Sequence, residues 1–352
     1  MFLEIDGSTG EGGGQILRTS LTMSAVLNHP VRIRNIRAGR DTPGLQPQHL
    51  TCVNALAKIT SADVAGAAFG SQQLKFEPRV LRSGDYRFDV AEGRPSAGSL
   101  SLVFQSILLP LAFAGGISKV KLLGGTHVPW SPPVHYLQMV YLPTIAEMGL
   151  QANIELKKLG WYPKGGGEVL AEIHPAQLHE MDLSERSRWI DVKGISVVGN
   201  LPLSVARRQQ DQALKVLKSE DIEASFESVD LPSSGQGTFV FILAELEKSR
   251  AGFIALGARG KRAEEVGEEA SQQCMDFLRA NAAIDEHLAD QLIPLMALAR
   301  GYSVFKTSRI TRHLLTNIWV AEQFLPVRFR VEGEEGQPGT VSVGGVGFRP
   351  QG

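Results

Sequence analysis

The stretch GQILRTSLTMSAVLNHPVRIRNIRAGRDTPGLQPQHLTCVNALAKI, residues 14–59, decides the fold of this chain. Its first part predicts a helix at 14–27, because Leu17, Leu21 and Ala25 recur every four residues, the spacing of one buried helix face. The segments predicted after this helix are a strand at 31–36, a loop at 38–49 and a second helix at 50–59. We therefore expect an αβ module whose helices cover one face of a sheet.

The same order of segments recurs twice further along the chain. The second copy comprises helix 99–114, strand 119–123, loop 124–135 and helix 136–148. The third comprises helix 286–299, strand 302–307, a loop at 309–313 and helix 314–325. Further strands are predicted after the second helices, at 73–76, 168–173, 327–331 and 340–343. Each first helix carries a glutamine, at Gln15, Gln105 and Gln291. Three such modules either stack as a simple array or converge their loops on one site.

Residues 184–277 follow a different plan. The predicted segments are strands 189–198, 224–229, 238–245 and 252–258 with helices 204–219 and 263–278. We interpret them as an inserted small α/β domain, and we assign 1–183 and 278–352 to a large domain. The insert contains GARGKRAEE, but its glycine and lysine spacing does not match a phosphate-binding P-loop.

Composition limits the functions open to the chain. It has 352 residues, of which 43% are hydrophobic and 21% charged, as in a soluble globular protein with two domains. No run approaches the ~20 apolar residues of a membrane span, so we expect a cytoplasmic protein that does not enter membranes. The net charge of −1 argues against binding a long duplex. Cys52 and Cys274 have no metal-ligand spacing and are expected to be buried.

His313 lies in a short strand-to-helix loop, Arg309 to Asn317. The following helix N-terminus favours negative charge, so a phosphate could bind beside the imidazole. The alternative is a loop histidine satisfied by a nearby backbone group, and the local pattern alone favours that alternative.

Other loops carry groups suited to phosphate. Glu11 lies in the glycine-rich segment 10–15 and is the only nearby ligand for a divalent cation, although that segment could equally be a tight crossover turn. Arg37 and Arg40 enter the first loop, where two guanidinium groups could clamp a phosphate, and Gln48 and His49 close it. No serine elbow, HExxH or CxxC occurs, which leaves phosphate chemistry.

Five fragments in order resemble RNA 3′-terminal phosphate cyclases: EGGGQILR (11–18), IRAGRDTPGLQPQHL (36–50), YPKGGGEV (162–169), EHLADQL (286–292) and HLLTN (313–317). The resemblance implies an α/β (α+β) fold with three repeated modules, like those of enolpyruvyl transferases and of an initiation-factor C-terminal domain, and an inserted smaller domain. It also implies that ATP adenylylates His313, that the AMP moves to an RNA 3′-phosphate, and that the 2′-OH then closes a 2′,3′-cyclic phosphate. AMP and pyrophosphate are the by-products.

The resemblance assigns further residues. The residues that it implies for binding ATP are Gln105, Pro133, His287, Leu288, Ala289, Asp290 and Gln291, and Pro133 would stack against the purine. The residues that it implies for binding the triphosphate or the RNA end are Arg18, Arg37, Arg40, Gln48 and His49. It implies Glu11 as the ligand of Mg²⁺ or Mn²⁺. The expected partner is an RNA with a 3′-phosphate end, and a homodimer is compatible with the family.

Two departures from the family pattern stand out. His287 replaces a tyrosine that relatives often carry, and Thr42 and Gln46 stand where relatives often have basic residues. Two other functions remain as alternatives. A non-catalytic RNA-binding relative involved in ribosome assembly would have the same fold, but such relatives lack the histidine that this chain retains. An enolpyruvyl transferase is disfavoured because it needs six modules.

Overall fold

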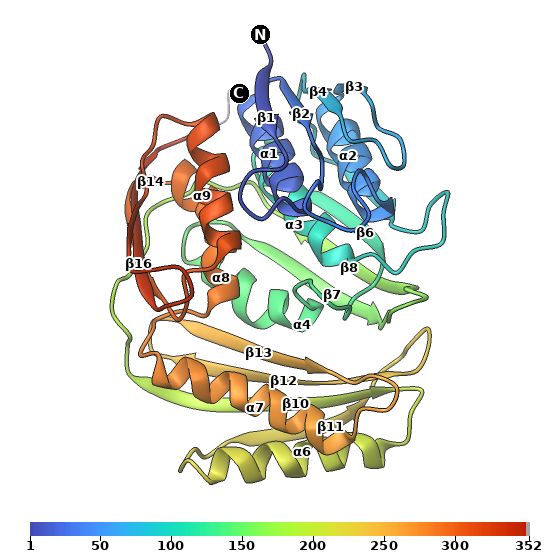
Figure 1. Cartoon of the computed structure of the whole chain (residues 1–352), viewed down its shortest axis with the longest axis vertical. Helices are drawn as coiled ribbons and strands as arrows, with labels where there is room; N and C mark the ends of the chain where they lie inside the picture. Colours follow the sequence, from blue (N-terminus) through green and yellow to red (C-terminus); the bar gives the residue numbers. More distant parts are fainter. Residues whose placement is uncertain (350–352) are drawn as a thin grey trace.

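The computed structural model describes residues 1–349, and Figure 1 shows three αβ modules above a layered insert. The first module consists of β1 (Leu3–Asp6), α1 (Gly14–Leu27), β2 (Val31–Arg34), α2 (Pro47–Thr60), β3 (Asp63–Ala65) and β4 (Leu74–Glu77). Its sheet has the order β1-β2-β4-β3, with β1 and β2 parallel and the other pairs antiparallel. The two predicted helices and the predicted strands are therefore present.

The second module repeats this topology. It contains β5 (Asp85–Asp89), α3 (Leu100–Ala112), β6 (Ser118–Gly124), α4 (Val134–Tyr136), the π-helical turn η1 (Leu137–Tyr141), α5 (Leu142–Ala146), β7 (Ala152–Lys158) and β8 (Gly167–Ile173). The sheet order β5-β6-β8-β7 matches the first sheet, again with its first pair parallel. The helix predicted at 136–148 is thus interrupted by a π-helical turn, because Pro143 interrupts regular α-helical bonding close by.

The third module has the same order of strands, although the insert divides it. Its elements are β9 (Asp182–Leu183), α8 (Glu286–Leu298), β14 (Arg300–Thr307), α9 (Arg312–Phe324), β15 (Arg330–Glu332) and β16 (Gly339–Val346). The sheet runs β15-β16-β14-β9, with β9 and β14 parallel. This common topology confirms the predicted three-repeat α/β fold. In all three copies the repeat unit begins one strand earlier than predicted, with β1, β5 and β9.

The insert lies between β9 and α8. It contains β10 (Trp189–Gly199), α6 (Leu203–Lys218), β11 (Ser225–Asp230), β12 (Gly237–Leu246), β13 (Arg250–Leu256) and α7 (Ala263–Arg279), with sheet order β11-β10-β12-β13. Alternate residues of β12 face opposite sides. Val240 and Ile242 join a core with the helices α6 and α7, while Phe239 and Phe241 join the core of the large domain. The insert therefore has its own core and also packs on the modules.

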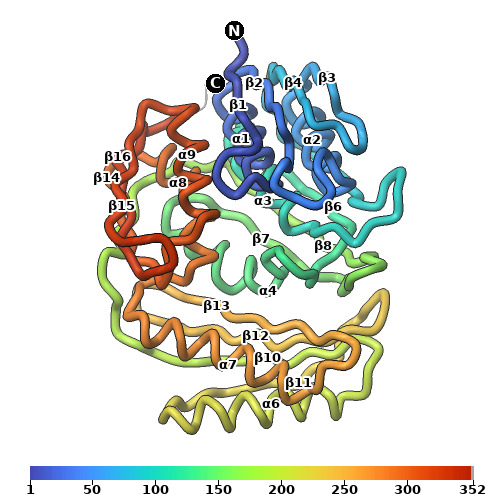
Figure 2. The backbone as a smooth tube through the Cα atoms, viewed as in Figure 1, coloured from blue at the N-terminus to red at the C-terminus, as the bar shows by residue number. Residues whose placement is uncertain are grey.

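Helices of different modules meet at the centre of the large domain. Figure 2 shows α8 and α9 between the third sheet and α1. Thr19 of α1 donates to Asn317 Oδ1 of α9 at 2.7 Å, and Thr22 of α1 donates to the Ser106 carbonyl of α3 at 2.8 Å. This packing brings the N-terminal ends of α1, α8 and α9 together.

No helix among residues 1–349 is long and apolar enough to cross a membrane. Both cysteines are buried, as expected.

Candidate active site around His313

His313 occupies the first turn of α9. Thr311 caps this helix, and its side chain accepts a hydrogen bond from the Leu314 amide at 3.1 Å. The imidazole is 50% exposed. First-turn amides have no partner inside a helix and carry partial positive charge, so an anion is favoured at this position. The placement at a helix N-terminus agrees with the sequence prediction.

One nitrogen of His313 is engaged, and the other, Nε2, makes no hydrogen bond or ion pair with any of residues 1–349. Nδ1 hydrogen bonds to Gln15 Oε1 and lies 2.8 Å from Glu11 Oε2. Both neighbours are acceptors, so they favour the tautomer that carries its proton on Nδ1. Nε2 then presents a lone pair toward an incoming electrophile. Gln15 and Glu11 are therefore the groups that orient this imidazole.

The glycine-rich segment 10–15 reaches α9 through close contacts. The Glu11 amide donates to Thr316 Oγ1 at 3.2 Å. Gly10 has a φ of +58°, and a Cβ at this position would collide with the Thr316 hydroxyl. A glycine is required here because only it fits both the left-handed backbone and the short approach. The segment is thus a tight turn and also the holder of Glu11 beside His313.

Glu11 is an almost buried carboxylate between a guanidinium group and an imidazole. Its side chain is 11% exposed and pairs with Arg40 as well as with His313. Within residues 1–349, neither carboxylate oxygen has a hydrogen-bond partner of good geometry. Charged oxygens left in this way are costly, and they fit a further ligand such as a cation carried on a phosphate. The same part of the chain holds no group of three or more His, Cys, Asp or Glu that could bind a metal ion on its own.

Asp290 belongs to the network behind His313. Burial raises the pKa of Asp290 to about 6, while His313, His287 and a hydrogen bond from Gln15 act in the opposite direction. The Asn317 amide donates to the Asp290 carbonyl at 2.8 Å and itself accepts from Thr19. These buried bonds fix α1, α8 and α9 relative to one another.

The electrostatics favour a neutral imidazole. Burial lowers the pKa of His313, and Asp290 opposes the shift. The positive charges of Arg18 and Arg40 lower it further. Because the ordinary pKa of histidine is about 6.5, the side chain is mainly uncharged and nucleophilic at pH 7.

Three arginines, Arg18, Arg37 and Arg40, lie around His49, and two of them, Arg18 and Arg40, also act on His313. Burial lowers the pKa of Arg18, whose side chain makes no ion pair or hydrogen bond with any residue the structure describes. Arg37 donates to the carbonyls of Thr42 and Gly44, the second at 2.9 Å, and burial together with Arg18 lowers its pKa. Arg40 approaches Glu11. Neighbouring guanidinium groups that repel one another are suited to a shared anion.

Gln48 and His49 are brought to the same place by the start of α2. His49 Nδ1 accepts from the Gln46 amide at 3.3 Å, which caps the helix. Burial holds the pKa of His49 well below its ordinary value, and the three arginines act in the same direction. Gln48 Oε1 accepts from the Ser99 amide at 2.8 Å, so only its amide nitrogen is left for a ligand.

The residues predicted to contact ATP divide into two groups. Gln105 donates to Gln291 Oε1 at 2.6 Å, Gln291 donates to the His287 carbonyl at 2.7 Å, and the His287 side chain is exposed. Leu288 and Ala289, in contrast, are fully buried in the core. Pro133 is also buried, at the N-cap of α4, so little of its ring is left for stacking. The structure therefore leaves no exposed side chain for the contacts predicted at Leu288 and Ala289, because the apolar face of α8 points inward.

Sequence reasoning gave no role to Gln15, Asn317 or Asp285. Asp285 caps α8 and also accepts hydrogen bonds from the Tyr136 hydroxyl at 2.8 Å and the Gly252 amide at 3.2 Å. The signal for Gln15 was present, since a glutamine recurs in the first helix of each module. Asp285 directly precedes the helix predicted at 286–299, which is the position of an N-cap, but nothing local marks Asn317.

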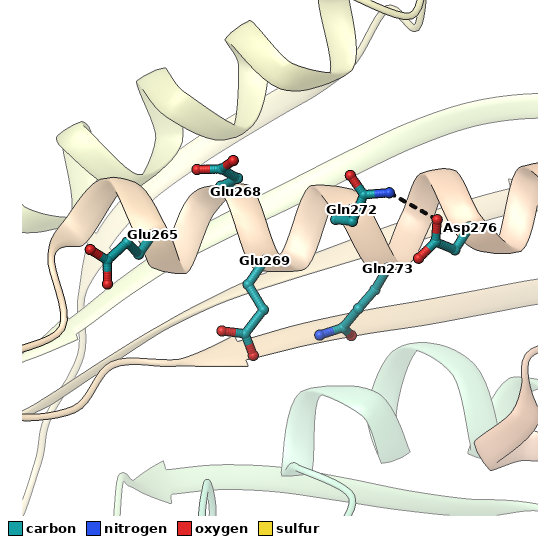
Figure 3. Close-up of a pocket in the computed structure, with 6 residues that line it drawn as sticks. All are labelled: Glu265, Glu268, Glu269, Gln272, Gln273 and Asp276. Atoms are coloured by element: carbon teal, nitrogen blue, oxygen red, sulfur yellow. Dashed lines mark hydrogen bonds between the residues drawn. The ribbon is translucent and has the colours of Figure 1, made fainter.

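A hollow elsewhere on the surface does not belong to this site. Figure 3 shows it on α7 of the insert, lined by Glu265, Glu268, Glu269, Gln272, Gln273 and Asp276. Four carboxylates would repel a phosphate at this position. The hollow is therefore unsuited to a nucleotide.

Comparisons with known proteins agree with the geometry. A model of the family described as RNA 3′-terminal phosphate cyclase matches residues 9–331. The chain is 44% identical over 359 residues to an RNA 3′-terminal phosphate cyclase of Staphylothermus marinus, covering 99% of each chain. It is 45% identical over 349 residues to the protein of that name from Methylococcus capsulatus, covering 98% of this chain and 97% of the other. A solved enolpyruvyl transferase, NikO from Streptomyces tendae, aligns at 15% identity over 49% of this chain and 33% of its own, with a TM-score of 0.28 that carries no argument.

Proposed function

Because the chain belongs to the RNA 3′-terminal phosphate cyclase family, we propose that it uses ATP to convert an RNA 3′-phosphate into a 2′,3′-cyclic phosphate through a covalent AMP on His313. The observation that carries the proposal is the imidazole itself. It is half exposed, its Nδ1 faces two acceptors, and the positive charges of Arg18 and Arg40 act on it. A non-catalytic RNA-binding relative would have no use for this arrangement.

The first step joins ATP to the protein. His313 Nε2 attacks the α-phosphorus, the bond from that phosphorus to the β-phosphate oxygen breaks, and pyrophosphate leaves. Nδ1 keeps its proton and donates a hydrogen bond to Gln15 Oε1, and the nearby Glu11 carboxylate stabilises the positive charge that forms on the ring. Arg18 and Arg40 lie where they can offset the growing negative charge on phosphate oxygens.

The second and third steps use the RNA. An oxygen of its 3′-phosphate attacks the phosphorus of the histidine-bound AMP, the N–P bond breaks, and an RNA-(3′)pp(5′)A intermediate forms. The 2′-hydroxyl then loses its proton, its oxygen attacks the phosphorus bonded to the 3′-oxygen, the anhydride bond from that phosphorus to AMP breaks, and AMP leaves as the ring closes. We assign Arg18, Arg37, Arg40, Gln48 and His49 to the triphosphate or the RNA end. Each offers at least one N–H donor there, which suits phosphate oxygens.

The remaining assignments extend this proposal. Gln105, His287, Asp290, Gln291 and the edge of Pro133 would meet the nucleotide. A divalent cation, Mg²⁺ or Mn²⁺, would be held by Glu11 together with phosphate oxygens, and it would supply neutralisation of phosphate charge. We further propose that residues 1–183 with 278–352 form the catalytic domain and 184–277 a separate domain. A cytoplasmic location and a homodimer remain predictions.

The test supplies purified protein with ATP, Mg²⁺ and an oligonucleotide that ends in a 3′-phosphate. We expect a cyclic end, recognised by its resistance to phosphatase, and equal release of AMP. A matched oligonucleotide with a 3′-hydroxyl should not change. If the protein binds the 3′-phosphate RNA but consumes no ATP, the non-catalytic function is correct instead.

A further inference from the structure

One exposed aromatic side chain near the site has no role in the chemistry described above. Phe69 is 47% exposed in the loop between β3 and β4. The Arg94 guanidinium carbon lies 4.0 Å from the centre of its ring. Arg94 is itself exposed and makes no ion pair with any of residues 1–349. A large apolar ring and an unpaired cation thus form a flat pair open to solvent.

The loop between β3 and β4, which contains Phe69, is hydrogen-bonded to the loop that carries Arg37. The Gly70 amide donates to the Leu45 carbonyl at 2.8 Å, and the Leu45 amide donates to the Ser71 carbonyl at 2.9 Å. Gly44 lies so close to Gly70 that a Cβ would meet its carbonyl oxygen at 2.2 Å. Arg37 in turn donates to the Gly44 carbonyl. The position of Phe69 is therefore fixed relative to the proposed phosphate-binding loop.

Arg94 is fixed to the same loop from the other side. It lies in the segment between β5 and α3, which Figure 2 shows as the blue-green tube at the right of the large domain. This segment ends at Ser99, whose amide donates to Gln48 Oε1 at 2.8 Å. Gly98 packs on Gln48 as well, since a Cβ there would lie 2.8 Å from Gln48 Cβ. Phe69 thus belongs to a segment bonded to Leu45, and Arg94 to a segment bonded to Gln48.

We propose that Phe69 and Arg94 form a stacking platform for an unpaired base at the 3′ end of the RNA, upstream of the phosphate that reacts. This inference rests on the proposed function, because it takes the phosphate to lie in the Arg37 loop. Proteins recognise single-stranded RNA by stacking bases on aromatic rings and guanidinium planes. A ring that has a guanidinium over one face and solvent around it provides such a surface. The net charge of −1 agrees with a contact made by a few local groups.

The platform has a chemical purpose in the proposed reaction. Ring closure needs the 2′-oxygen and the 3′-phosphorus of one ribose in a fixed orientation. Holding only the phosphate would leave that ribose free to rotate about its bonds to phosphate. A stacked base would remove this freedom without reading the sequence, since every base has a flat face. Phe69 and Arg94 are positioning residues in this account.

The experiment compares Phe69→Ala, Phe69→Trp, Arg94→Ala and Arg94→Lys with the unaltered protein, and Tyr302→Ala serves as the matched control for an exposed aromatic residue, 61% exposed on β14. A fluorescent 3′-phosphate oligonucleotide reports binding by anisotropy without any turnover. We expect Phe69→Ala to weaken binding about tenfold. Phe69→Trp should bind as the unaltered protein does, and Arg94→Lys should not fully restore what Arg94→Ala loses, because an ammonium group does not stack. The control should show no change.

Abasic oligonucleotides distinguish stacking from other roles. Two oligonucleotides are compared, one without the base of the last nucleotide and one without the base of the second-last nucleotide. One of them should bind the unaltered protein more weakly than the intact RNA does. With that oligonucleotide, Phe69→Ala should cause little further loss of affinity. If Phe69→Ala binds the intact RNA as tightly as the unaltered protein, or if it weakens intact and abasic RNA equally, the platform is wrong. AMP attachment to His313 should be unchanged in Phe69→Ala. Loss of that attachment in the unaltered protein would instead contradict the proposed function, and the binding comparison would still stand.

Discussion

Two histidine sites in this chain both have pKa values lowered by burial, but they differ in solvent exposure and in hydrogen-bond partners. His313 stands at the open start of α9. His127 and His135 form a buried pair, with Nε2 of the first 2.9 Å from Nδ1 of the second, where the second module meets the insert. Burial lowers the pKa of all three side chains. A lowered pKa therefore does not by itself identify a nucleophile.

The neighbours of the two sites explain the difference. Both nitrogens of His127 are occupied, one by His135 and the other by the Thr126 hydroxyl at 2.9 Å. The ring of His127 also stacks on Phe239 of the insert, with centroids 4.3 Å apart and planes 16° apart. His313 has acceptors on one nitrogen and arginines nearby, and its second nitrogen has no partner in the part of the chain that the structure describes. The buried pair thus holds two parts of the molecule together, whereas the exposed imidazole can react.

The largest effect expected from this comparison concerns His313→Ala. Without the nucleophile no AMP can be carried, so turnover should fall by at least about 10³-fold. The rate of RNA cyclisation measures it, with the exposed His174→Ala as control. A variant that retains a tenth of the activity would show that another group carries the AMP.

The buried pair should affect stability instead. His127→Ala leaves His135 without its partner and opens a cavity against Phe239, so the free energy of unfolding should fall by about 2–4 kcal/mol. Urea titration measures it. AMP attachment should persist under conditions where the variant is folded. Loss of AMP attachment in a folded His127→Ala protein would erase the distinction between the two sites.

Lowering the pH should reduce the free energy of unfolding, because it protonates His135 of the same pair. Burial lowers the pKa of His135 to about 4, compared with 6.5 in the unfolded chain. Between these values the unfolded state binds more protons than the folded state, so stability falls as the pH decreases from 6.5 to about 4. This group alone accounts for a loss of up to about 3 kcal/mol. Urea titrations at several pH values should show a shallower decline in His135→Phe, and an unchanged decline would rule this histidine out as the source.

A smaller effect is expected from the group that orients His313. Gln15→Ala removes an acceptor from Nδ1 and should slow AMP attachment about 10- to 100-fold, with Gln15→Glu retaining more of the rate because it keeps an acceptor. Single-turnover labelling with ATP measures this step. Thermal unfolding provides the control, since a loss of rate that follows a loss of folding would not support an orienting role.

The sequence predicted the elements that have clear periodicity and missed those that have none. Helices such as α1 and α9 follow regular apolar spacing, so they lie within a few residues of their predicted bounds. The strands β3 and β9 span only 3 and 2 residues, which is too short to show an alternation of apolar and polar residues. Helix α7 runs to Arg279 and so crosses the boundary predicted at residue 277.

The candidate site was predictable in part for similar reasons. His313 and Arg37 are marked by loop position and residue type. The bond between His313 and Gln15 joins residues 298 apart in the chain, and no local pattern specifies such a contact. The left-handed backbone of Arg37, with φ at +56°, depends on the loop around it rather than on its own preference. The contacts at Leu288 and Ala289 stay predictions. Both side chains are buried, and the face of α8 that points inward is set by the elements packed against it.

The most direct test of the central claim is to locate the AMP. The unaltered protein is incubated with α-labelled ATP and Mg²⁺ but without RNA, digested with protease under alkaline conditions, and its labelled peptide identified by mass spectrometry. We predict one acid-labile, alkali-stable adduct on the peptide that contains His313, lost in His313→Ala and discharged when 3′-phosphate RNA is added. Label on a peptide containing His49, His127 or His135, or label retained by His313→Ala, would contradict the account.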